Sequence, residues 1–452
     1  MVQTFFFYDL ETSGLSPQSD RIMQFAGQRT DLNFNIIGEP INLLIQLSND
    51  TLPSPSAIFV TKITPQKTLT DGITEAEFAK IAQTEIFTPG TIAIGYNTIR
   101  FDDEFMRYLF WRNFYDPYEW TWKDNRSRFD LLDLVRLTRA LRPEGINWPV
   151  SETGKATNRL ELLTKLNNID HLHAHDALSD VFASIAVAKL IHAHQPDLFN
   201  YLFKLRNKKT LQRFINLEHK KPFVYTSGRY ATEFHKTTIA FPLTSARNGN
   251  LLVFDLRYNL DKILRTRSST PNSSPSFHPI VKEFHFNKCP AVAPLSVLSK
   301  QDGWRKIKLT PKIIQKNLKS LLSHPEFAES MREIAEQIPD FTSPDPESAL
   351  YEGFLNDADR ANANAVLSAT PSELADFSPA FLDERLPHLL IHYKARNFPT
   401  ILTESEAKIW QTYRKARLQF QSTKFKEELA ILSTQDKSLA KKLEDYFASI
   451  SS

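Results

Sequence analysis

Two carboxylates stand two residues apart at the end of an apolar, aromatic run near the start of the chain. The segment FFFYDLET (residues 5–12) places Asp9 and Glu11 on either side of Leu10. Side chains alternate along a strand, so Asp9 and Glu11 project from one face while Leu10 points to the other. Two acids on one face repel each other, and hard divalent cations such as Mg²⁺ bind oxygen ligands of this kind. The spacing predicts a metal site at the end of a buried strand, against the plainer interpretation of a strand with a polar end.

Two later segments are candidates to bring further acids to this site. In IGYNTIRFDDE (residues 94–104) a strand ends, the chain turns, and a helix begins at Asp102 or Asp103, where an acid either caps the helix or faces a metal. In HDALSDV (residues 175–181), Asp180 lies one turn into an apolar helix that His175 precedes. Because imidazole titrates near neutral pH, His175 is suited to take a proton from water.

Histidines in the same region allow a different metal site. His171, His173 and His175 alternate, and two more histidines follow on the next helix. Several imidazoles can bind zinc. The single cysteine, Cys289, excludes both an internal disulfide and a cysteine-ligated zinc cluster. The carboxylate site is therefore the favoured interpretation, and zinc is the alternative.

The elements that must position these residues alternate between strand and helix up to about residue 194. We predict strands at residues 4–10, 22–29, 41–47 and 91–95, and helices at residues 75–86, 103–113, 130–141, 160–166 and 177–193. This alternation is typical of an α/β layer fold.

The rest of the chain changes character twice. Lysine and arginine crowd into residues 204–221, and the short apolar segments 223–225, 238–241, 251–256 and 281–286 predict a small β-rich unit. A Ser/Pro-rich stretch at residues 267–276 is too polar to pack, and we expect it to be a mobile loop. Helical periodicity begins at residue 311 and is interrupted at residues 339–346. We predict three domains, covering residues 1–195, 196–340 and 341–452.

Composition excludes some classes of protein. The chain has 452 residues, 41% of them hydrophobic and 24% charged, as in globular proteins. No apolar stretch is long enough to span a bilayer, and the N-terminus lacks the features of a signal peptide, so we expect a cytoplasmic protein without a membrane partner. The net charge of +3 neither demands nor excludes a nucleic-acid partner.

The acidic motifs together resemble the DEDD exonuclease superfamily in its histidine-bearing subclass, over residues 4–193. The resemblance rests on Asp-x-Glu in a first strand, Asn-x-x-x-Phe-Asp after a later strand, and His-x-x-x-x-Asp at a helix start. Further segments along nearly the whole chain are similar to the bacterial exonuclease I family: residues 95–97 (GYN), 100–104 (RFDDE), 112–118 (RNFYDPY), 141–148 (LRPEGINW), 174–177 (AHDA), 287–290 (NKCP), 357–360 (DADR) and 393–399 (YKARNFP).

The resemblance implies a fold and an activity. The fold would be a ribonuclease-H-like exonuclease domain with an SH3-like β-domain and an all-helical C-terminal domain. The activity would be 3′→5′ processive degradation of single-stranded DNA to 5′-mononucleotides by two-metal-ion hydrolysis, in DNA repair and recombination. Carried over by motif, Asp9, Glu11 and Asp180 would hold two Mg²⁺ ions, with Mn²⁺ as the alternative. Asp102 would support the second metal, and His175 would be the general base.

The resemblance also implies partners. Besides single-stranded DNA, the acidic C-terminal tail of the single-strand DNA-binding protein would bind a basic surface of the chain. The family is typically monomeric, and a monomer is expected here.

Strand recognition requires cations for phosphates and flat rings for bases. Arg107 and Arg112 lie on the helix that begins at Asp102, and Tyr118, Trp120 and Trp122 follow. Together they predict a funnel toward the metals. Further predicted contacts to the substrate are Glu11, Arg128, Arg136, Arg159, Lys208, Lys209, Lys288 and Arg396.

Two other functions are compatible with parts of the sequence. A catalytically silent single-strand binding protein would not need the five acidic and histidine positions. A 3′→5′ RNase or a proofreading subunit of the same superfamily would not explain the two additional domains. The nuclease for single-stranded DNA is therefore preferred.

Overall fold

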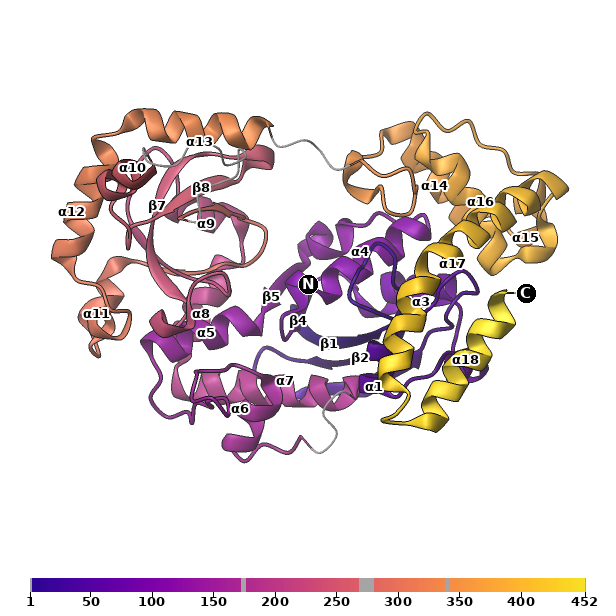
Figure 1. The fold of residues 1–452 in the computed structure, drawn as a ribbon, viewed down its shortest axis with the longest axis horizontal. Helices are drawn as coiled ribbons and strands as arrows, with labels where there is room; N and C mark the ends of the chain where they lie inside the picture. Colours follow the sequence, from indigo (N-terminus) through magenta and orange to yellow (C-terminus); the bar gives the residue numbers. More distant parts are fainter. Residues whose placement is uncertain (1, 172–175, 268–279, 338–341, 452) are drawn as a thin grey trace. The chain divides into compact units, whose positions relative to one another are not determined.

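The computed structural model describes residues 2–171, 176–267, 280–337 and 342–451. The chain forms two compact units (Figure 1). Unit 1 comprises Met1–Ser127, Leu172–Phe182 and Phe341–Ser452, and unit 2 comprises Arg128–His171 and Ala183–Asp340. The N-terminal and C-terminal quarters of the sequence thus belong to the same unit.

Unit 1 is built on a mixed sheet. Unit 1 contributes to this five-stranded sheet the strands β1 (Thr4–Thr12), β2 (Ile22–Thr30), β3 (Ile36–Leu44) and β4 (Thr91–Gly95), which are neighbours in the order β3-β2-β1-β4. β1 pairs antiparallel with β2 and parallel with β4. Glu11 faces Gln24 across the β1/β2 ladder, and the register shifts between Glu11 and Thr12. β1 therefore lies in the interior of the sheet, and its regular pairing ends at the second of the two predicted carboxylates.

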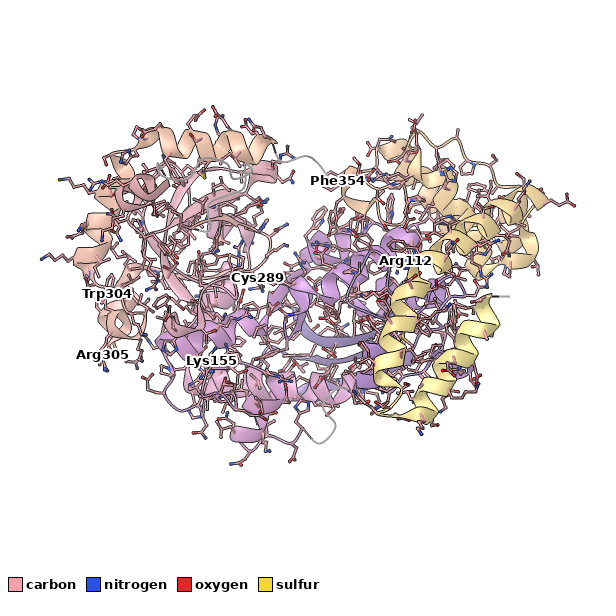
Figure 2. The ribbon with its side chains drawn as sticks, viewed as in Figure 1. Arg112, Lys155, Cys289, Trp304, Arg305 and Phe354 are labelled. Atoms are coloured by element: carbon pink, nitrogen blue, oxygen red, sulfur yellow. The ribbon has the colours of Figure 1, made fainter. Side chains whose placement is uncertain are left out.

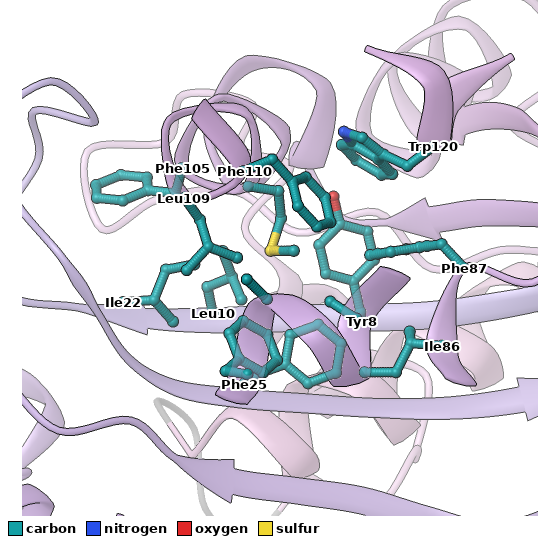
Figure 3. Packing of buried hydrophobic residues seen from close by; sticks show 14 of the residues in the cluster. Tyr8, Leu10, Ile22, Phe25, Ile86, Phe87, Phe105, Leu109, Phe110 and Trp120 are labelled. Carbon is teal, nitrogen blue, oxygen red and sulfur yellow. The ribbon is translucent and has the colours of Figure 1, made fainter. Parts of the chain in front are cut away.

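The alternation in β1 separates core from site. Phe6, Tyr8 and Leu10 belong to one buried hydrophobic cluster, in which they pack with Phe25 and Trp120 among others (Figure 3). Asp9 and Glu11, at the alternate positions, project from the opposite face of the strand. Burial of the apolar set thus fixes which way the two carboxylates point.

Helices complete unit 1. Near the sheet the chain forms α1 (Pro55–Thr61), α2 (Pro65–Asp71), α3 (Glu75–Ile81), a π-helix (Ala82–Ile86), α4 (Asp102–Arg112) and the first turns of α7 (Ala177–His194). The C-terminal part is all helical, with α14 (Asp357–Ser368), α15 (Pro371–Asp376), α16 (Arg385–Asn397), α17 (Glu404–Leu432) and α18 (Lys437–Ser451).

A second hydrophobic cluster joins the two ends of the sequence within unit 1. It contains Met23, Leu47 and Ile58 from the N-terminal part and Leu443 and Ile450 from α18. α1 contacts both α17 and α18. The N-terminal and C-terminal parts of unit 1 therefore share one core.

Unit 2 contains a second, antiparallel sheet. Its strands are β6 (Phe223–Thr226), β7 (Thr237–Ser245), β8 (Leu251–Asp255), β9 (Val281–Phe284) and β10 (Ala291–Ala293), in the order β10-β6-β7-β8-β9. The helices are α5 (Leu131–Leu141), α6 (Leu160–Leu166), the rest of α7, α8 (Pro196–Leu205), α9 (Lys208–Phe214), α10 (Leu260–Arg267), α11 (Gly303–Lys306), α12 (Pro311–Leu322) and α13 (Pro325–Gln337). The short strand β5 (Ser127–Asp130) lies at the passage from unit 1 to unit 2.

The predicted elements differ from the observed ones in a few places. β3 covers Ile36–Leu44 rather than residues 41–47; its first five residues are exposed, and Gly38, Glu39 and Pro40 interrupt the apolar pattern there. The helix predicted at residues 75–86 changes to a π-helix after Ile81. Residues 268–276 of the predicted Ser/Pro-rich loop lie outside the described residues. In the described part of the chain, no helix is both long and apolar enough to cross a membrane.

Candidate active site

The end of β1 and the start of α7 bring three carboxylates together. Asp9, Glu11 and Asp180 are each half-buried, and one oxygen from each lies within 4.8 Å of the others. Asp180 occupies the first turn of α7, as the sequence predicted. The local reason is the apolar start of that helix: Ala177 and Val181 are buried, which fixes the helical face on which Asp180 lies.

Burial and neighbouring negative charges shift the titration of Asp9 and Glu11. Burial, together with the charges of Asp102, Asp180 and Asp176, raises the pKa of Asp9 well above its ordinary value. Burial and the charges of Asp9, Asp180 and Asp176 raise the pKa of Glu11 to about 9. Carboxylates held this close either retain protons or bind a cation.

The donor set fits a hard divalent cation. Three carboxylate oxygens on one side of a sheet are ligands that Mg²⁺ and Mn²⁺ prefer. No described histidine belongs to the group. Within the described residues, the candidate metal site is therefore formed by carboxylates, as the favoured interpretation predicted.

Asp102 lies beside the cluster and supports its backbone. Its side chain is buried, and Oδ1 accepts a hydrogen bond of 3.1 Å from the backbone N–H of Leu10, the residue between the two β1 acids. Asp102 is the first residue of α4, whose N-cap is Phe101, so it does not cap the helix. Its neighbour Asp103 accepts a hydrogen bond from the hydroxyl of Tyr8. Both acids thus tie α4 to β1.

Only some of the histidines named in the prediction lie within the described residues. His175, the predicted general base, lies outside the described residues, as does His173. Asp176, which follows His175, accepts a hydrogen bond of 3.1 Å from the backbone N–H of Ser179 at the start of α7. His171 instead approaches Thr164, with Nδ1 3.1 Å from the hydroxyl oxygen.

One side of α4 carries a cation and aromatic rings. Nη1 of Arg107 lies 2.9 Å from Oε1 of Glu104 and 3.1 Å from the hydroxyl of Tyr351, which also donates to Glu104. The guanidinium of Arg107 lies 5.5 Å from the ring centre of Tyr118. The ring of Tyr118 in turn meets Phe354 edge-on at 5.4 Å. Arg107, a cation predicted from the sequence, thus lies among aromatic rings from the N-terminal and C-terminal parts of unit 1.

Among the exposed rings of unit 1, Trp122 and Phe354 follow α4 or contact Tyr118. Trp122 is 63% exposed, and Phe354, labelled in Figure 2, is 79% exposed. Trp122 was predicted from the sequence, whereas Phe354 and Tyr351 were not. In the sequence, only the position of Tyr351 and Phe354 just before residues 357–360, one of the segments similar to the exonuclease I family, could have indicated these two rings.

Three predicted DNA contacts are wrong, because their side chains are buried and used elsewhere. Arg112 (Figure 2) is 1% exposed and pairs with Glu75, with Nη2 2.6 Å from Oε1. Trp120 is packed into the core cluster of the sheet. Arg396 is buried in an ionic cluster with Asp50.

The predicted contacts in unit 2 are placed as follows. Arg128 is buried and donates to the backbone carbonyl of Asn287 at 2.7 Å. Arg136 pairs with Asp133 at 2.7 Å, and its guanidinium lies beside Gly228. The remaining cations are Arg159, paired with Glu161 at 2.6 Å, the exposed Lys208 and Lys209 in the first turn of α9, and the half-buried Lys288 after β9.

Sequence profiles of known families match three successive parts of the chain. Residues 6–188 match a family described as "Exonuclease", residues 206–337 match the "Exonuclease I SH3-like domain", and residues 344–450 match the "Exonuclease I C-terminal domain". The matches agree with the predicted α/β, β-rich and helical parts and confirm the predicted fold class.

Relatives match over nearly the full length. Exodeoxyribonuclease I of Haemophilus influenzae is 40% identical over 450 residues, covering 94% of this chain and 93% of the relative. The crystal structure of E. coli exonuclease I in complex with a dA16 oligonucleotide is 38% identical, with a TM-score of 0.92 and coverage of 99% of this chain and 100% of that chain. A crystal structure of SSB/exonuclease I in complex with the inhibitor CFAM is 38% identical, with a TM-score of 0.90 and full coverage of both chains.

Proposed function

This chain belongs to the exonuclease I family of exodeoxyribonucleases, and from this premise we propose that it shortens single-stranded DNA in the 3′→5′ direction, releasing 5′-mononucleotides processively. The observation that carries the proposal is the cluster of Asp9, Glu11 and Asp180, whose ligand atoms lie within 4.8 Å of one another. A relative solved with a dA16 oligonucleotide supports the choice of substrate.

The acids have distinct roles in this proposal. Asp9, Glu11 and Asp180 would hold two Mg²⁺ ions, with Mn²⁺ as the alternative. Bound cations would supply charge stabilisation for the attacking and leaving oxygens of the phosphodiester. Asp102 positions the ligands, because its bond to the N–H of Leu10 holds the strand between Asp9 and Glu11.

A base is still needed to take a proton from the attacking water. His175 fills that role in the proposal, since it directly precedes Asp176 at the start of α7 and imidazole titrates near neutral pH. Asp176 holds the start of that helix through its bond to Ser179.

The strand is held by phosphate contacts and stacking. Arg107, Tyr118 and Trp122 would guide the nucleotides nearest the metals, since they lie on α4 or follow it in the same unit. Outside unit 1, the proposed phosphate contacts are Arg136, Arg159, Lys208 and Lys288. Such contacts carry no sequence information, which suits an enzyme that must digest every sequence.

The domain boundaries, the cellular location, the oligomeric state and the protein partner are also proposals. The domains would cover residues 1–195, 196–340 and 341–452, and the protein would act as a cytoplasmic monomer in DNA repair and recombination. The relative solved as SSB/exonuclease I supports a partner of the same kind, with the acidic SSB tail bound to a basic surface of this chain.

Digestion of three labelled substrates tests the function. Single-stranded DNA, duplex DNA and RNA of equal length, each labelled at the 5′ end, are incubated with Mg²⁺ or with EDTA. We expect a ladder that shortens from the 3′ end on single-stranded DNA alone, abolished by EDTA. Cleavage mainly of RNA would assign the chain to RNases of the superfamily, and tight binding without cleavage would favour a silent binding protein.

A further inference from the structure

A pocket lies in unit 2, formed by residues outside the carboxylate cluster. It has a volume of about 370 Å³ and is lined by residues of β7, β8, β9 and the segment between β6 and β7. Asp255 faces Ala240 across the β7/β8 ladder, and Lys282 faces Val253 across the β8/β9 ladder. Because side chains alternate, Asp255 and Lys282 lie on the same face of the sheet.

Asp255 is the unusual residue of this pocket. It is 5% exposed, and its Oδ1 accepts hydrogen bonds from the hydroxyl of Thr238 and from the backbone N–H of Arg257, the latter at 3.0 Å. Its Oδ2 receives no hydrogen bond from the described residues. Burial raises the pKa of Asp255, even though Arg257 and Lys282 are near. Oδ2 is not among the buried side-chain atoms that lack a partner, so it is open to the pocket, where it can accept a hydrogen bond from a ligand that brings an N–H group.

The pocket is otherwise positively charged. Arg229, Lys236, Arg257 and Lys282 all line it. Arg257 is held in place by hydrogen bonds of 3.0 Å to the carbonyls of Ile307 and Thr237, and its guanidinium lies 3.5 Å from the ring centre of Phe234. Four cations around one acid favour an anionic ligand.

Arg136 connects this pocket to the proposed path of the strand. A Cβ atom on Gly228, which lines the pocket, would meet the guanidinium of Arg136 at 3.0–3.2 Å. Arg136 is one of the proposed phosphate contacts.

A nucleotide can bind the cations of the pocket and Asp255 at the same time. Its phosphate can bind the cations, while an exocyclic amino group on its base can donate to Oδ2 of Asp255. Phe234 and the 43% exposed Tyr258 supply flat rings in the lining. A bare phosphate would gain the cations but bring no donor to Oδ2 of Asp255.

We propose that this pocket binds one nucleotide whose base carries an exocyclic amino group, either as a unit of the DNA strand or as a free mononucleotide. The strand form of this inference rests on the proposed function. Cytosine presents its N4 amino group as a donor, and aspartate accepts from it in known complexes. Thymine has no amino group and would place carbonyl oxygens beside the carboxylate.

Asp255→Asn provides a sharp test. The backbone N–H of Arg257 and the hydroxyl of Thr238 both require an acceptor, so the amide oxygen takes the Oδ1 position and the amide NH₂ faces the pocket. The variant thus presents a donor where the wild type presents an acceptor. It suits a thymine carbonyl and opposes a cytosine amino group.

Binding is measured by fluorescence anisotropy with 5′-labelled oligo-dC and oligo-dT of equal length, in EDTA to prevent cleavage. We expect the wild type to bind oligo-dC about three- to tenfold more tightly, the effect of one hydrogen bond. Asp255→Asn should abolish or reverse this ratio. Lys236→Gln should weaken both strands by the same factor, because a phosphate contact does not distinguish bases. Asp302→Asn, at an exposed acid of unit 2, is the matched control and should change neither affinity.

Titration of dCMP and dTMP by ligand-observed NMR distinguishes the two sources. Binding of dCMP that is lost in Asp255→Asn, without a strand preference, assigns the pocket to the free nucleotide. Equal affinities for oligo-dC and oligo-dT together with no Asp255-dependent binding of dCMP would overturn the inference. Wild-type digestion of single-stranded DNA with Mg²⁺ is run in parallel, since its failure would count against the proposed function and not against the pocket.

Discussion

Arg396 and Asp50 are 346 residues apart in the sequence, yet Nη2 of Arg396 lies 2.9 Å from Oδ2 of Asp50 in the interior of unit 1. Nε of Arg417 lies 3.2 Å from the same carboxylate oxygen. Glu347 joins the cluster through Arg396 and through Arg21, whose Nη2 lies 2.6 Å from Oε2 of Glu347. The N-terminal and C-terminal parts of unit 1 therefore share a buried ionic cluster as well as an apolar core.

Replacing Asp50 by Ala should destabilise the protein by about 3–5 kcal/mol, because the buried guanidinium groups of Arg396 and Arg417 lose their counter-charge. The measurement is urea unfolding followed by circular dichroism. Asp445→Ala is the control, since Asp445 forms an exposed pair with Lys441 on α18 and should cost less than about 1 kcal/mol. Equal losses in the two variants would show that the cluster contributes no specific stability.

The same cluster should make the protein sensitive to acid. Burial alone would raise the pKa values of Asp50 and Glu347, but the guanidinium groups of Arg396, Arg417 and Arg21 hold them below the ordinary range. Carboxylates with a lowered folded-state pKa stabilise the protein fully above the unfolded pKa, about 4, and lose this contribution as the pH falls below it. The free energy of unfolding, measured from pH 7 to pH 3, should fall less steeply below about pH 4 in Asp50→Asn than in the wild type. Parallel curves would contradict this account.

Replacing Asp180 by Asn should reduce metal-dependent turnover by several orders of magnitude, while DNA binding persists. The change removes a ligand from the three-carboxylate cluster but leaves the proposed phosphate contacts intact. Release of labelled mononucleotides reports turnover, and anisotropy in EDTA reports binding. Asp197→Asn, at an exposed acid on α8, is the matched control and should leave both unchanged. Unchanged cleavage by Asp180→Asn would remove this residue from the site.

Metal binding should release protons. Without a cation, burial and the neighbouring carboxylates raise the pKa of Glu11 to about 9, so this group holds a proton at neutral pH. A cation requires the carboxylate form, and the proton is expelled as Mg²⁺ binds. Calorimetry in two buffers with different ionisation enthalpies measures the number released, which should be smaller for Glu11→Gln. A binding heat that does not depend on the buffer would argue against shared protons in the metal-free site.

Neutralising Lys208 and Lys209 together should shorten the run of nucleotides removed per encounter. Both are exposed in the first turn of α9, and each phosphate contact that is lost weakens the hold on the strand between cleavage steps. The assay uses labelled DNA with an excess of unlabelled trap strand. The exposed lysines 441 and 442 on α18 form a matched pair whose neutralisation should leave the run length unchanged. No difference between the two double variants would exclude these contacts.

The carboxylate site was predictable because its determinants are local. Alternation of Phe6, Tyr8 and Leu10 with Asp9 and Glu11 fixes both the strand and the face of each side chain. The apolar helical period of residues 177–193 similarly placed Asp180 on α7. Each element could be predicted from fewer than twenty consecutive residues. The resemblance to the DEDD motifs then predicted that these elements meet at one site.

The interior was not predictable where it depends on distant partners. Trp120 and Trp122 are two residues apart and chemically identical, yet Trp120 is 1% exposed and Trp122 is 63% exposed. A short 3₁₀ turn over Glu119–Thr121 decides which ring enters the core. The sequence around Arg396 indicates only a helix with basic residues, which predicts a DNA contact and gives no sign of a buried partner. Its buried acid lies at the other end of the chain.

The apolar cluster shared by Met23, Leu47 and Leu443 also bears on synthesis of the protein. A ribosome extends the chain at about 5–20 residues per second, so roughly 17 to 70 s separate synthesis of β4 from that of α18. During that interval the nascent sheet lacks the helices that cover one of its apolar surfaces. Translation of the last hundred residues is therefore the event that completes the first unit, and chaperone engagement before that point would protect the exposed surface from aggregation.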